Sequence, residues 1–272
     1  MIGLRADLSV AINANSKPRF FSKGFSFDPY LTPRANSNPS NNIARKRSVA
    51  TKTALRKLIP DVQDPRLLNT VLDLQEFALG ANLAFQTGRK IPTDLFHETL
   101  VSVQYRLLAL RGEDDAPQHQ MLMHHLLFLG MLAFSATTFL QIKQMPMSHG
   151  DLARRMRECV PRLLVRVGEE ECSPQEQRLA LWFLFVANIS VLGSTVEDKT
   201  MLVKATRQLV VGLGLAEACW DKVRDILRTV MWIDWLHSEG GKEFWDKVVA
   251  GVLSGEAGIV AGLQTPEAHW SS

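Results

Sequence analysis

An apolar stripe organises the stretch of chain from residue 219 to residue 248. At about 100° per residue, five apolar side chains fall on one helical face: Val223, Ile226, Leu227, Val230 and Ile233. Asp234 and His237 continue that face, where apolar residues would be expected. Because glycine commonly ends helices, we predict that this helix stops at Gly240-Gly241 and that a second, shorter helix begins at Lys242.

Helix start and stop signals repeat along the chain from Pro60 onward, with little sign of strands. Asp64-Pro65 places a capping side chain before a proline, and Ser173 with Glu176 forms a capping box. Thr195 with Asp198 begins another helix in the same way. Helices are predicted over residues 65–86, 93–112, 117–143, 148–168, 173–193, 195–212 and 220–248, the last as a pair.

These signals predict an all-α fold, with one domain of about eight antiparallel helices over residues 61–254. Two segments without formal charge, 121–142 and 179–196, are long enough to span a bilayer. Both contain several polar residues, and the mean hydropathy of the chain is −0.02, so buried core helices are favoured. A small integral-membrane protein that uses these two segments is the alternative.

Charge is distributed unevenly along the chain. Residues 1–60 carry eleven Lys or Arg and two acidic residues, so the remainder is net acidic although the whole chain is +3. Asn, Ser and Pro crowd this region, and we predict a disordered basic arm over residues 1–60 and a flexible tail over 255–272. The arm contains a basic cluster that is interpreted as an import signal, a polyanion contact or a solvated linker: Arg45, Lys46, Arg47, Lys52, Arg56 and Lys57. A mitochondrial presequence is a further interpretation of the arm, and Asp7 argues against it.

Residues with catalytic or metal-binding chemistry are sparse. The three cysteines lie far apart, the histidines show no metal-ligand spacing, and glycine-rich phosphate-binding or nucleophile motifs do not occur. Cys219 is interpreted as a small core residue. We therefore expect no metal site, no cofactor and no enzymatic activity.

Asp234 and His237 are the unusual pair in this sequence, because they are three residues apart on an otherwise apolar stripe. A buried carboxylate needs a partner, which favours an internal ion pair or a cap to another helix, with Arg178 or Arg207 as a candidate partner. The other interpretation is a polar anchor in the wall of a small-molecule effector pocket. General acid–base catalysis is the least favoured interpretation.

Residues 174–248 resemble the regulatory domain of fungal-specific transcription factors. The likeness lies in Trp182 within the apolar run QRLALWFLFVAN, in Trp220 and Trp232 within CWDKVRDIL and MWID, and in Trp245 within FWDKV. This resemblance implies an all-α regulatory domain, a nuclear location and a role in transcriptional control. It also implies coregulator partners and, as a further option, a small-molecule effector.

The chain departs from that family at one point. Its members usually carry a six-cysteine, two-zinc DNA-binding cluster before the helical body, whereas residues 1–158 here contain no cysteine. Our expectation is therefore a regulator that acts through its helical domain without a zinc cluster of its own. A regulator that contacts DNA through the basic arm is the alternative.

Overall fold

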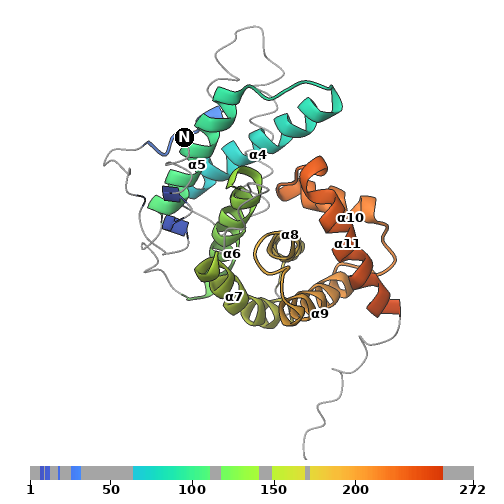
Figure 1. The fold of residues 1–272 in the computed structure, drawn as a ribbon. Coiled ribbons are helices and arrows are strands. Elements are labelled where there is room, and N and C mark those ends of the chain that lie inside the picture. Colours follow the sequence, from blue (N-terminus) through green and yellow to red (C-terminus); the bar gives the residue numbers. More distant parts are fainter. Residues whose placement is uncertain are drawn as a thin grey trace, which may run out of the picture.

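The computed structural model describes residues 7–8, 10–12, 18, 26–31, 64–110, 118–140, 149–168 and 172–253. Within these residues the chain is entirely helical apart from turns and connections, which confirms the all-α prediction (Figure 1). The elements from residue 64 onward are α4 (Pro65–Gln86), α5 (Thr93–Ala109), α6 (Gln118–Ser135), the π-helical turn η1 (Ala136–Leu140), α7 (Gly150–Gly168), α8 (Pro174–Ser190), α9 (Val196–Gly212), α10 (Trp220–Val230) and α11 (Asp234–Leu253). The predicted C-terminal tail, 255–272, lies outside the described residues.

Three helices begin at side-chain caps that the sequence predicted. The Asp64 carboxylate accepts a hydrogen bond from the backbone N–H of Arg66 at the start of α4. Ser173 and Glu176 form the predicted capping box at the start of α8, and the Thr195 hydroxyl caps α9. Each cap satisfies backbone N–H groups that lack partners within the first turn of a helix, so these caps set where the helices start.

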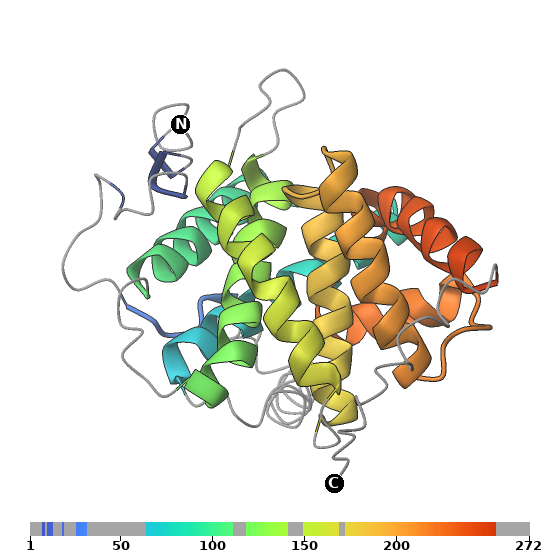
Figure 2. The same ribbon diagram turned by 90° about the horizontal axis from the view of Figure 1, so that it is seen from below.

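Helix α8 lies at the centre of the bundle. In Figure 1 it is viewed nearly along its axis and is surrounded by α6, α7, α9, α10 and α11. Figure 2, turned by 90°, shows α7, α8 and α9 side by side. Every residue from Leu179 to Ala187 is buried, because this helix is apolar on all its faces and must be covered on all of them.

The two uncharged segments are parts of this core. Residues 121–142 correspond to α6 and the π-helical turn, and residues 179–196 to α8 and the following turn. Among the described residues, no helix has the length and apolar character needed to cross a membrane.

The predicted helix break at Gly240-Gly241 is wrong. The break falls at residues 231–233, between α10 and α11, and α11 runs through both glycines. A Cβ atom at Gly241 would lie 2.7 Å from the Trp220 ring and 2.9 Å from the Trp232 ring. Glycine at this position therefore allows two indole rings to pack against the helix rather than ending it.

The prediction of a disordered arm over residues 1–60 is wrong for the parts that the structure describes. Leu8, Ala11 and Ile12 belong to the buried core. The backbone N–H groups of Tyr30 and Leu31 donate to the Asp73 carboxylate, at 2.7 and 2.8 Å. Segments of the first 60 residues are thus packed against the helical body, so residue 60 is not the boundary of the folded domain.

A buried ion pair fixes this packing. Arg106 of α5 and Asp73 of α4 have no exposed side-chain surface and are joined by an ion pair. Arg106 also donates to the backbone carbonyl oxygens of Ser102 and Asp28. Because Asp73 accepts from Tyr30 and Leu31 as well, most of the polar atoms of the pair have partners, as a buried charge requires.

We expect Gly130→Ala to destabilise the protein, because a methyl group on this residue of α6 would overlap the ring of Trp182. Overpacking of this kind costs about 1–3 kcal/mol of unfolding free energy. The measurement is chemical denaturation of the full chain. The matched control is Gly80→Ala in α4, where a Cβ atom meets nothing within 4 Å and helix propensity should make the change neutral or stabilising. Equal stability of the two variants would contradict the packing of α6 on α8.

Candidate functional site

The break at residues 231–233 and the two residues that flank it carry backbone groups that no helix satisfies, and side chains from α4 and α8 bind them. Gln75 of α4 donates to the carbonyl oxygen of Val230, at 2.6 Å. The Trp182 indole N–H of α8 donates to the carbonyl oxygen of Met231, also at 2.6 Å. Asn82 of α4 donates to the carbonyl oxygen of Trp232 and accepts from the N–H of Asp234, both at 2.8 Å. These contacts tie α4 and α8 to the break.

Three of the four tryptophans that carry the family resemblance are buried, and the fourth is partly buried. Trp182, Trp232 and Trp245 are each at most 3% exposed, and Trp220 packs against the same core. Phe185 of α8 lies within 6.4 Å of both Trp220 and Trp232, measured between ring centroids. Aromatic pairs at these separations add to the stability that burial alone provides, so these residues are packing residues.

Asp234 and His237 have different partners, so the predicted internal pair is wrong. Asp234 opens α11, and its two carboxylate oxygens accept from Arg228 of α10 at 3.0 and 2.5 Å. Arg207, one of the expected partners, instead donates to the carbonyl oxygens of Lys247 and Val248, and the other, Arg178, is an exposed residue of α8. Since the chain leaves the helix at 231–233, the two residues do not continue the stripe of α10.

His237 is a buried neutral histidine with both ring nitrogens engaged. It is 3% exposed, and its Nδ1 accepts from the backbone N–H of Ile233 at 3.3 Å. Nε2 therefore carries the proton and donates to the Thr137 hydroxyl, also at 3.3 Å. Burial lowers the pKa of His237 to about 3. The ring consequently stays uncharged near neutral pH and helps to hold the break in place.

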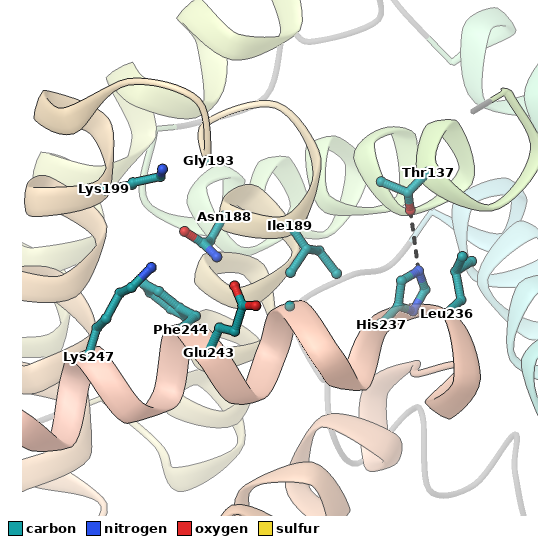
Figure 3. A pocket seen from close by; sticks show the side chains of 11 residues that line it. Thr137, Asn188, Ile189, Gly193, Lys199, Leu236, His237, Glu243, Phe244 and Lys247 are labelled. Carbon is teal, nitrogen blue, oxygen red and sulfur yellow. Dashed lines mark hydrogen bonds between the residues drawn. The ribbon is translucent and has the colours of Figure 1, made fainter. Parts of the chain in front are cut away.

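A cavity of about 350 Å³ lies beside His237, between the C-terminal end of α8, the N-terminal half of α9 and α11 (Figure 3). His237 and Thr137 occupy one end of it, and their hydrogen bond is drawn in the figure. Three charged side chains, Lys199, Glu243 and Lys247, lie toward the other end. A cavity of this size with both signs of charge can hold a small polar molecule. His237 thus lies in the wall of a pocket, but both of its ring nitrogens are bound within the protein, and Asp234 is not among the residues that line this cavity.

Of the other residues that the sequence singled out, the basic cluster at 45–57 lies outside the described residues. Cys219 is exposed, so its assignment to the core is wrong, whereas Cys159 and Cys172 are buried. Burial raises the pKa of the Cys159 thiol to about 11. Within the described ranges, no group of three or more His, Cys, Asp or Glu side chains is arranged to hold a metal ion.

Sequence reasoning missed several residues that build the site. Gln75 and Asn82 face the break from α4 although more than 140 positions separate them from it. Thr137 faces His237 from the π-helical turn that follows α6, a type of irregularity that often occurs at functional sites. The sequence offered one signal for Gln75, because it is a polar residue on the buried face of a predicted helix. No feature of the neighbouring sequence indicated a role for Thr137.

Comparison of the chain with protein-family models, with curated proteins and with solved structures gave no match.

We expect the burial of His237 to make the protein less stable as the pH falls. The unfolded chain binds a proton on this residue below a pKa of about 6.5, whereas the folded protein does so only near 3, so folding stability decreases as the pH falls through this range. For this residue alone the loss between pH 7.5 and 5.5 is about 1.4 kcal/mol.

The measurement is denaturant unfolding of the wild type and of His237→Gln at the two pH values. His149, whose pKa burial also lowers, is present in both proteins, so its contribution cancels in the difference. The wild type should lose about 1.4 kcal/mol more than the variant. Equal losses would show that His237 titrates normally and is not buried as described.

Proposed function

We propose that this protein regulates transcription through its helical domain, in the nucleus, by binding partner proteins rather than by contacting DNA through a zinc cluster. The observation that carries the proposal is the resemblance of residues 174–248 to fungal-specific transcription factor regulatory domains. The residues that carry it form α8, α10 and α11, together with the break between the last two.

The arrangement of these residues favours a binding role for the domain. Trp182 and Trp232 are fixed inside the core, and His237 uses both ring nitrogens to hold the break and Thr137. A histidine bonded in this way at neutral pH has no free nitrogen with which to accept a proton from a substrate. The cavity beside it offers charged and polar groups at a size suited to a small effector, which we propose as the regulatory ligand site of the domain.

The basic cluster from Arg45 to Lys57 is proposed as the nuclear import signal. It holds six Lys or Arg within thirteen residues, a density typical of such signals. Deletion of residues 1–60 is a poor test of this assignment, because Leu8, Ala11 and Ile12 lie in the hydrophobic core and their loss would destabilise the domain. Substitution within the cluster avoids this problem.

The test is microscopy of the full chain, fluorescently tagged, in a fungal cell. We expect nuclear signal from the wild type, and its loss when the six basic residues of the cluster are replaced by alanine. The matched control removes the same number of charges from exposed positions on the helical body: Arg89, Lys90, Arg162, Arg178, Lys222 and Lys242. The control should remain nuclear. A wild type that resides at mitochondria or membranes would contradict the proposed function.

A further inference from the structure

A groove runs along the outer face of α9, from its first turn to its last residue. Its volume is about 840 Å³, and it is bordered by the C-terminal end of α7 on one side and by Lys247 of α11 on the other. In Figure 1 α9 lies between these two helices. The groove is lined by Leu164, Val167, Gly168, Lys199, Thr200, Val203, Lys204, Arg207, Gln208, Val211, Gly212 and Lys247. The α9 residues among these recur at helical spacing and make one continuous face.

Apolar side chains form the floor of this groove. Leu164 and Val167 contribute from α7, and Val203 and Val211 from α9. Val211 is 57% exposed, whereas Leu164, Val167 and Val203 are partly buried and pack against the core. A partly exposed apolar strip bordered by charged residues is a surface that another molecule can cover.

The charges around the floor are positive. Lys199, Lys204, Arg207 and Lys247 line the groove, and none of the described residues that line it is acidic. Arg207 is held in place by the carbonyl oxygens of Lys247 and Val248. Asp198, next to Lys199, is already bound by Arg157 of α7 through two hydrogen bonds of 2.7 and 2.8 Å. Glu243 of α11 lies near Lys199 and Lys247 in the adjoining cavity, so the groove keeps a net positive charge that is smaller than its four cations alone would give. The hydrogen bonds of Arg157 and Arg207 also fix α7 and α11 against α9.

The shape of the groove favours a helix over a small molecule. From Lys199 to Gly212 the groove follows thirteen helical steps of 1.5 Å each, a length of about 20 Å, which matches three to four turns of a second helix. A small ligand is usually enclosed on most of its surface, whereas Val211, Lys204 and Gln208 are exposed along this face. Apolar residues with positive charges beside them complement a helix that has an apolar face and an acidic face.

We propose that the groove along α9 binds an acidic amphipathic helix of a partner protein. The inference rests on the proposed function only in naming that partner as a transcriptional coregulator. Apolar residues of the partner helix lie on Leu164, Val167, Val203 and Val211, and its carboxylates face Lys199, Lys204 and Lys247. Long-range attraction between these charges speeds association, and contact with the apolar floor slows dissociation.

The test uses the full chain and a fluorescent 16-residue peptide with leucines on one helical face and glutamates on the other. Fluorescence anisotropy should show saturable binding that weakens as salt is added. Lys204→Glu and Val211→Glu should each weaken binding by about tenfold. Both side chains are exposed, so both variants should fold.

Two controls match these variants in residue type and exposure. Lys222→Glu reverses an exposed lysine of α10, and Val165→Glu places a charge on a valine of α7 that is 68% exposed and does not line the groove. Both should bind the peptide as the wild type does. A peptide of the same composition in scrambled order, without an apolar face, should bind at least about tenfold more weakly than the amphipathic one.

Four results would overturn the proposal. The first two are equal binding of the scrambled peptide and unchanged binding by Lys204→Glu and Val211→Glu. The third is self-association of the chain that either variant abolishes, because a second copy would then occupy the groove. The fourth is binding of a long-chain carboxylate in place of the peptide. Failure of nuclear localisation would count against the proposed function and leave this binding result standing, so the two failures are distinguishable.

Discussion

The structure depends on satisfying the buried backbone at residues 231–233. An extended segment inside a helical domain exposes N–H and C=O groups that have no helical partner, and each such group left unpaired would cost about 1–3 kcal/mol. Gln75, Asn82, Trp182 and His237 provide the missing partners from α4, α8 and α11. The position of α4 against the second half of the bundle, and the orientation of His237 at the cavity, both follow from this requirement.

The central helix α8 adds a second constraint, which is close packing on all of its faces. Because α8 is apolar on every face, the helices around it must approach closely, and Gly130 and Gly241 provide room for the indole rings of Trp182, Trp220 and Trp232. Lys199 and Lys247 line both the cavity beside His237 and the groove on α9, so a ligand at either place meets the same two positive charges.

Local signals predicted the helix starts well, since the caps at Asp64, Ser173 and Thr195 depend only on neighbouring residues. The break at 231–233 could not be predicted in this way, because Met231, Trp232 and Ile233 continue the helical pattern and the groups that stabilise the break lie far away in sequence. Gly241 indicated a helix end, whereas its actual role is close packing of rings. The Asp73–Arg106 pair could not be predicted either, because its two residues are far apart in sequence. Only the fold brings α4 and α5 together around residues 28–31.

We propose that the helical domain changes transcription by recruiting partners. The most direct test of this proposal fuses the full chain to an unrelated DNA-binding module and measures transcription of a reporter that carries the module's binding site in a fungal cell. The account predicts that transcription rises or falls relative to the module alone, and that Lys204→Glu moves it back toward that baseline. Transcription equal to the module alone, with the fusion present on the promoter, would contradict the account.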